Sequence, residues 1–142
     1  MRVAAVTHAA GLSSTGDAVI DALLPLPERS IVSPETARAV MVARAEGGRV
    51  LAVGTSVVRA LEGAVDDHGV VRPGERVTGL RVDGSLRPRV VDALLTGVHE
   101  PGTSHHALMS AFAREGDLAR ANDLAAAQGY LLHEFGDSVL IA

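Results

Sequence analysis

The sequence contains no cysteine, no lysine and no tryptophan, and it has only one tyrosine and two phenylalanines among 142 residues. The absence of cysteine excludes disulfides, thiolate nucleophiles and thiolate metal sites. The absence of lysine excludes Schiff-base chemistry and a Walker-type phosphate lysine. With so few aromatic rings, stacking platforms for nucleic-acid bases are scarce. Any acid–base chemistry therefore falls to the six histidines and seventeen carboxylates.

The chain also lacks a positive net charge and a long apolar run. Thirteen arginines stand against seventeen acidic residues, which gives a formal charge of -4. We therefore expect the chain alone to bind nucleic acid weakly. No apolar run approaches the ~20 residues that a membrane span needs, and the amino terminus is too short for the apolar core of a signal peptide. These features predict one cytoplasmic domain over residues 1–142 without a membrane partner.

Apolar runs alternate with helix and turn signals along the chain. This pattern is typical of an α/β fold, here with a mostly parallel sheet and helices packed on it. The two prolines in 25–29 predict an irregular reversal, and the β-branched run 50–53 predicts a central strand buried on both faces. We expect strands at 3–6, 50–53, 90–96 and 138–141, another near 77–82, and helices at 34–46, 57–64, 104–115 and 117–128.

A hydroxyl-rich turn, Gly54-Thr55-Ser56, lies between the strand 50–53 and the next helix. Free backbone N–H groups at a helix start favour an anionic ligand, and Arg59 lies one turn further along the helix, where it could close over that ligand. The alternative is a tight turn in which Ser56 only caps the helix. Because ligands of open α/β sheets bind at the carboxyl ends of strands, the turn that begins at Thr96 is the second place to search.

The segment after Thr96 carries three histidines within eight residues. Adjacent positions on a helix point about 100° apart, so His105 and His106 are not expected to share a metal ion. Imidazole has an unperturbed pKa of about 6.5 and suits proton transfer. His99 is therefore the main candidate for an acid or base, whereas His106 is expected to be a solvated helix residue. The candidates for substrate binding in this segment are Thr96, Pro101, Thr103, Ser104 and His105.

Four further polar residues stand near predicted strands. His8 follows the first strand and is a candidate for substrate binding. Glu134 and Asp137 precede the last strand and are candidates for acid–base catalysis beside His99, although for Asp137 a polar turn alone is the favoured interpretation. Asp92 lies within an apolar strand, so we expect it to pair with an arginine or with backbone donors. No metal site is expected.

Taken together, these segments resemble the carboxyl-terminal half of the S-adenosylmethionine:tRNA ribosyltransferase-isomerase family of queuosine biosynthesis. Order and spacing match over about residues 3–141, and the match is specific as an ensemble. The matching segments are Val6-Thr7-His8 with Gly11, 32–37, 48–55, 59–62, 90–96, His99-Glu100-Pro101 with Ser104, 110–112 and 136–141.

The resemblance implies transfer of the ribosyl part of S-adenosylmethionine, as a co-substrate, to the aminomethyl group of a deazaguanine in a tRNA anticodon. Adenine and methionine leave, the ribose rearranges to an epoxycyclopentane, and no metal is expected. A base must remove the C–H beside the sulfonium and a donor must help adenine depart, which are roles for histidine or carboxylate in a site that excludes water.

The chain departs from the family pattern within the candidate site. The family has Thr-Ser where this chain has Ser56-Val57, Asn-Phe in place of Gly97-Val98, and Ser-Tyr in place of Glu134-Phe135. Leu23 and Leu26 replace a pair of histidines. These changes indicate a divergent branch whose acceptor, tRNA or a small deazaguanine-like molecule, can differ.

The family's enzymes are longer and include an inserted β-barrel that this chain lacks, which indicates a fragment or shortened form. We therefore expect uncovered apolar surface and self-association. The alternative function is a catalytically inactive relative that acts as a ligand-binding or interaction domain. A third possibility is a scaffold that binds no ligand. It would require that neither the hydroxyl-rich turn 54–56 nor the histidine segment after Thr96 has a role in function.

Overall fold

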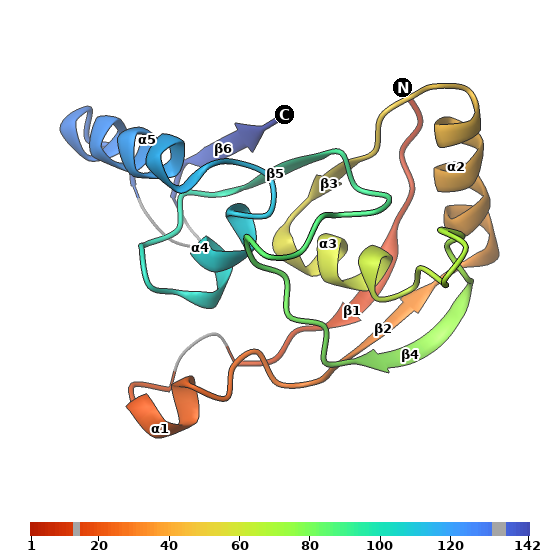
Figure 1. Ribbon diagram of the computed structural model, residues 1–142, viewed down its shortest axis with the longest axis horizontal. Helices are drawn as coiled ribbons and strands as arrows, with labels where there is room; N and C mark the ends of the chain where they lie inside the picture. Colours follow the sequence, from red (N-terminus) through yellow and green to blue (C-terminus); the bar gives the residue numbers. More distant parts are fainter. Residues whose placement is uncertain (13–14, 132–135) are drawn as a thin grey trace.

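The computed structural model describes residues 1–12, 15–131 and 136–142, and these form an α/β arrangement of small sheets and helices (Figure 1). The elements in chain order are β1 (Val6–Ala9), α1 (Ala18–Asp21), β2 (Glu28–Val32), α2 (Pro34–Ala45), β3 (Leu51–Val53), α3 (Thr55–Glu62), β4 (Gly74–Thr78), β5 (Ala93–Gly97), α4 (Ser104–Met109), α5 (Glu115–Ala127) and β6 (Ser138–Ile141).

The strands of the described residues form two three-stranded sheets, in the orders β1-β2-β4 and β3-β5-β6. The first sheet is antiparallel throughout, and β5 also pairs antiparallel with β6. Among the strands of the described residues, only β3 and β5 run parallel. The expectation of a mostly parallel sheet is therefore wrong. A parallel pair needs a crossover connection, and here the chain between β3 and β5 contains the helix α3.

The strand β3 lies at the edge of its sheet, and β5 is central. The expectation that 50–53 is central and buried on both faces is wrong, because Leu51 and Val53 are 47% and 63% exposed while Ala52 between them is fully buried. A continuous apolar run does not reveal whether both faces are covered. On the open face, Val53 pairs with Leu95, and Leu95 pairs with Leu140. This apolar row is the surface on which self-association, still a prediction, depends.

Several elements confirm the local sequence signals. α2 begins where expected, with Ser33 accepting a hydrogen bond from the Thr36 N–H at 3.1 Å and Pro34 in the first helical position. α3 and β6 also lie close to their predicted ranges. Asp92 has the expected partners, since its Oδ2 accepts from the Val50 N–H at 2.8 Å and its Oδ1 lies 3.4 Å from Arg44.

Other boundaries differ from the expectation. The strand expected at 3–6 forms at Val6–Ala9, that near 77–82 at Gly74–Thr78, and that at 90–96 at Ala93–Gly97. The helix expected over 104–115 ends at Met109, and α5 begins at Glu115 with Arg114 rather than Asp117 as its N-cap. The segment 25–29 was expected to be irregular, but Glu28 and Arg29 belong to β2 because β1 and β4 pair with them on either side.

α3 lies between the two sheets and contacts β1, β2, β3 and β5 (Figure 1). Its buried side chains Val58 and Leu61 join a core that includes Val32 of one sheet and Leu94 of the other. Burying such aliphatic groups supplies the main driving force for this packing. The helix that follows the candidate anion-binding turn therefore also holds the sheets together.

Glu62, at the end of α3, is a buried carboxylate that binds backbone. It accepts hydrogen bonds from the N–H groups of Arg89, Val90 and Val91 at 2.9, 3.0 and 2.9 Å. Buried backbone donors need partners, and this carboxylate supplies them for the segment that leads into β5. Glu62 thus fixes where the central strand enters the sheet.

We expect Glu62→Ala to lower the free energy of unfolding by about 2–4 kcal/mol, because it leaves three N–H groups without their charged acceptor. Urea denaturation followed by circular dichroism measures this loss. Glu46→Ala is the matched control, since Glu46 is exposed and surface changes usually stay within about 0.5 kcal/mol. Equal effects of the two substitutions would contradict the structural role of Glu62.

Candidate functional site

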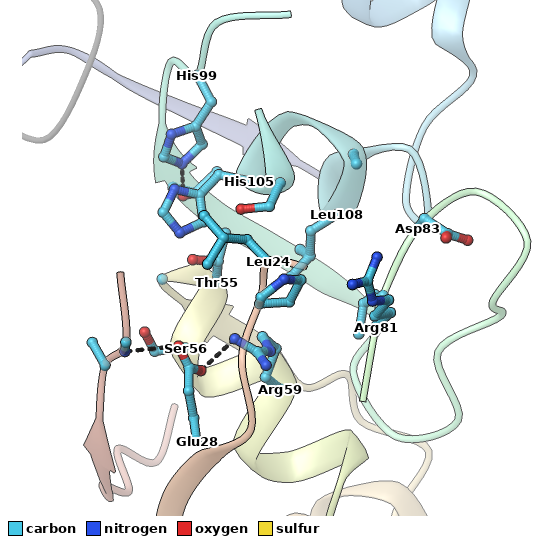
Figure 2. A pocket seen from close by; sticks show the side chains of 18 of the residues that line it. Leu24, Glu28, Thr55, Ser56, Arg59, Arg81, Asp83, His99, His105 and Leu108 are labelled. Atoms are coloured by element: carbon cyan, nitrogen blue, oxygen red, sulfur yellow. Dashed lines mark hydrogen bonds and ion pairs between the residues drawn. The ribbon is translucent and has the colours of Figure 1, made fainter. Parts of the chain in front are cut away.

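A cavity of about 320 Å³ is lined by segments from both sheets and from α4 (Figure 2). Its size is at the lower end of the range for small-molecule sites. Both apolar and polar side chains line it, so it offers apolar surface as well as specific contacts. The lining residues come from the loop after β1 (10–12), the approach to β2 (Leu24, Pro25, Glu28), the start of α3 (54–56 and Arg59), the segment 81–83, the end of β5 and its loop (Thr96, His99), and α4 (Ser104, His105, Ala107, Leu108).

The turn Gly54-Thr55-Ser56 forms one wall of the cavity. Gly54 has φ +95°, a conformation that glycine adopts without the strain of a side chain. Its N–H donates to the Leu95 carbonyl at 2.8 Å, which ties the turn to β5. Gly54 is the N-cap of α3, and no side chain caps this helix within the described residues. The alternative in which Ser56 serves as the cap is therefore not what the structure shows.

A buried ion cluster lies next to this wall, and its Glu28 and Arg59 also line the cavity. Arg59 donates from Nη1 to Glu28 Oε2, and both side chains are 8% exposed. Glu28 Oε1 accepts the Gly11 N–H at 2.8 Å. His8 Nε2 lies 3.0 Å from Glu28 Oε2, without the alignment of a hydrogen bond. The carboxylate thus connects β2, α3 and the loop after β1.

Arg59 lines the cavity, but its guanidinium is already engaged. Besides Glu28, it donates from Nε to the Leu80 carbonyl and from Nη2 to the Leu26 carbonyl, each at 3.3 Å. A cation neutralised in this way attracts a further anion less strongly than an unpaired one. Its main contribution in this structure is to fix the cavity wall.

The two cavity histidines stand together beyond the end of β5. The His99 Nε2 atom lies 2.8 Å from the Thr96 hydroxyl, so one of the two donates to the other. The His99 and His105 ring centroids are 4.8 Å apart, with the planes tilted by 43°. Both rings lie on the same side of the cavity in Figure 2. Because β3 and β5 are parallel, their carboxyl ends bring this pair and the Gly54 turn to one site.

The remaining residues of the histidine segment have other positions. Ser104 lines the cavity, whereas Thr103 caps α4 by accepting the His106 N–H at 3.1 Å, and Pro101 lies in an exposed turn outside the cavity. His106 is 5% exposed, and its Nε2 has no partner in the described part of the chain. The expectation of a solvated His106 is wrong, because the 100° step that turns His105 to the cavity turns His106 to the core.

Of the two acidic candidates near the carboxyl end, Glu134 lies outside the described residues. Asp137 is not among the cavity residues. Its Oδ2 accepts the Leu131 N–H at 2.9 Å, and its own N–H donates to the Leu131 carbonyl at 2.9 Å. The backbone N–H and the carboxylate of Asp137 are thus both bonded to the backbone of Leu131.

Sequence reasoning missed Glu28, Arg81 and Asp83 as cavity residues. A charged residue at the start of an alternating strand, Glu28-Arg29-Ser30-Ile31-Val32, was the available signal for Glu28, since Glu28, Ser30 and Val32 are the buried positions. For Asp83, the Ser85 hydroxyl, followed by the Ser85 backbone N–H, lowers the pKa below its ordinary value. Asp83 is thus held as a carboxylate at neutral pH.

The described residues contain neither a cluster of metal ligands nor a membrane-spanning helix. No group of three or more histidine, aspartate or glutamate side chains is placed to hold a metal ion. No helix in that part of the chain has the length and apolar character needed to cross a membrane.

Comparison with known proteins identifies the class. The family model described as Queuosine biosynthesis protein matches residues 2–141. The S-adenosylmethionine:tRNA ribosyltransferase-isomerase of Symbiobacterium thermophilum is 44% identical over 110 residues, which cover 78% of this chain and 32% of that protein. The same enzyme of Gluconacetobacter diazotrophicus is 39% identical over 114 residues, covering 80% and 32%.

A solved structure agrees with these matches. The crystal structure of S-adenosylmethionine tRNA ribosyltransferase from Thermotoga maritima has a TM-score of 0.72 and 33% identity, covering 81% of this chain and 40% of that one. The chain belongs to the S-adenosylmethionine:tRNA ribosyltransferase-isomerase family. It spans about a third of the length of the curated relatives that it matches.

We expect Arg59→Met to lower the free energy of unfolding by about 3–5 kcal/mol, because it leaves Glu28 as an uncompensated buried charge. The double variant Glu28→Gln, Arg59→Met removes that charge and should be more stable than Arg59→Met alone. Chemical denaturation of four proteins, the unmodified chain, Glu28→Gln, Arg59→Met and the double variant, measures both effects. If the stability loss of the double variant equals the sum of the losses of Glu28→Gln and Arg59→Met, the two side chains are not coupled, and this result would contradict the prediction.

Proposed function

We propose that this chain binds S-adenosylmethionine in the cavity and takes part in transferring and isomerising its ribosyl group onto a deazaguanine base of tRNA or a related acceptor. The observation that carries the proposal is the convergence of the Gly54 turn and the His99–His105 pair on one cavity. The family's activity belongs to proteins of which this chain covers about a third, so substrate, acceptor and activity are all part of the proposal.

The reaction needs proton transfer in a site that excludes water. A base must take the C–H proton made acidic by the neighbouring sulfonium, and a donor must assist the departure of adenine. We assign the first role to His99, because the Thr96 hydroxyl fixes its Nε2 and hence its ring orientation. His105, 4.8 Å away between ring centroids, is placed to contact the same ligand. Leu24 and Leu108 contribute apolar lining, which strengthens electrostatic interactions inside.

The hydroxyls and backbone of Thr55, Ser56 and Ser104 supply polar contacts to the ligand in this proposal. Thr55 is buried and Ser56 is half-buried, and both line the cavity. Asp137 is not among the cavity residues, so the proton-transfer proposal rests on the histidines. A cytoplasmic location, where tRNA modification takes place, stays a prediction.

A second function, ligand binding without catalysis, is favoured by one observation. The formal charge of -4 gives tRNA no bulk electrostatic attraction. Release of adenine from S-adenosylmethionine, measured with and without tRNA, separates the two functions. Binding without release in either condition would favour the second.

We expect His99→Ala to reduce adenine release by about 10²–10⁴-fold, because it removes a positioned proton-transfer group. His68→Ala is the matched control, since His68 is exposed and is not among the cavity residues. His106→Ala, in the core, should lower the melting temperature without a comparable loss of turnover by the folded protein. Equal losses of turnover for His99→Ala and His106→Ala would reject the assignment of His99.

A further inference from the structure

The cavity has a second charged group, Arg81 and Asp83, that the roles proposed above do not use. Both residues line the cavity, at the end away from the two histidines in Figure 2. Arg81 is exposed and Asp83 is half-buried, whereas Val82 between them is buried in the core. The side chain of Val82 therefore anchors the segment from which the two charges project.

The backbone of this segment is tied to the ion cluster. The Leu80 carbonyl accepts from Arg59 Nε at 3.3 Å, and the Leu80 N–H donates to the Thr78 hydroxyl at 3.1 Å. Arg59 in turn pairs with Glu28. Arg81 and Asp83 thus project from a segment whose position is set by the same interactions that shape the cavity wall.

Arg81 is oriented but retains donors. Its Nη2 donates to the Leu23 carbonyl at 2.9 Å and to the Ala22 carbonyl at 3.4 Å, just after α1. Its Nε and Nη1 make no hydrogen bond within the described residues. Glu28 neutralises Arg59, whereas Arg81 makes no salt bridge within the described residues, so Arg81 is the cavity arginine that attracts an anionic ligand more strongly. The planar guanidinium group, with its N–H donors in a fixed geometry, suits a carboxylate.

Asp83 retains an acceptor beside Arg81. Its Oδ1 accepts the Ser85 N–H at 2.8 Å and the Ser85 hydroxyl at 2.6 Å. In the described part of the chain Oδ2 makes no hydrogen bond, and no ion pair joins Asp83 to Arg81 in Figure 2. Arg81 is nonetheless near enough to help lower the pKa of Asp83. An open pair of opposite charges can accept both charges of a zwitterion.

We propose that Arg81 and Asp83 form a subsite for an α-amino acid group, with the ligand's carboxylate on Arg81 and its ammonium on Asp83. The inference rests on the proposed function, because it assigns this end of the cavity to the methionine part of S-adenosylmethionine. The histidine end then receives the ribosyl and adenine parts. The subsite selects ligands that carry an intact amino acid group. It also fixes the orientation in which the ligand lies in the cavity.

The test compares three ligands by isothermal titration calorimetry: S-adenosylmethionine, its decarboxylated form, and methylthioadenosine, which lacks the whole amino acid group. Loss of a charge-assisted contact should weaken binding of the decarboxylated form by about 10- to 100-fold. Arg81→Gln should weaken S-adenosylmethionine by a similar factor and leave methylthioadenosine unchanged. Arg87→Gln is the matched control, since Arg87 is exposed and outside the cavity.

Asp83→Asn tests the ammonium contact in the same way, with Asp67→Asn as its control because Asp67 is exposed and outside the cavity. The ratio of two ligands' affinities does not change when a substitution merely loosens the fold. Equal binding of the three ligands by the unmodified protein would overturn the subsite while leaving S-adenosylmethionine as the ligand.

If none of the adenosyl ligands binds, the proposed function fails, and the subsite is tested separately with L-methionine and 3-(methylthio)propylamine by NMR. Shifts of the Arg81 and Asp83 amides with L-methionine alone, lost in Arg81→Gln, would support the subsite. Absence of such shifts would overturn it together with the proposed function.

Discussion

The buried ion pair between Glu28 and Arg59 connects the parts of this fold that enclose the cavity. Glu28 belongs to the antiparallel sheet, and Arg59 belongs to the helix that packs against both sheets. The same carboxylate holds the Gly11 N–H, and the same guanidinium holds the Leu80 carbonyl. Removing either charge leaves the other buried without compensation, which is costly. The spatial relation among three cavity walls therefore depends on this pair.

Whether a feature could be predicted from the sequence depends on how far apart along the chain the interacting residues are. α2 was predictable because Ser33 and Pro34 act on the turn that follows them. The meeting of the Gly54 turn with His99 followed from one parallel strand pair. The edge position of β3 and the β2 strand depend on partners far along the chain, which local patterns do not encode. The pairing of Glu28 with Arg59, 31 positions away, was missed for the same reason.

Family membership and cavity geometry bear on different parts of the function. Membership is shown by a match over residues 2–141, but the curated relatives are about three times longer than the part that aligns. Residues of this chain line the cavity, and its polar groups gather at two ends, imidazoles at one and an open charge pair at the other. Ligand binding can therefore be separated experimentally from the acceptor chemistry of the longer enzymes.

The most direct test of this account is a titration of the isotope-labelled chain with S-adenosylmethionine, followed by two-dimensional NMR of the backbone amides. The account predicts saturable shifts at Gly11, Thr55, Ser56, His105 and Arg81, which come from separate segments but line one cavity. Amides of α5, which contributes no cavity residue, should stay unchanged. Shifts confined to α5 or to the open face of β3, or no shifts at saturating ligand, would contradict it.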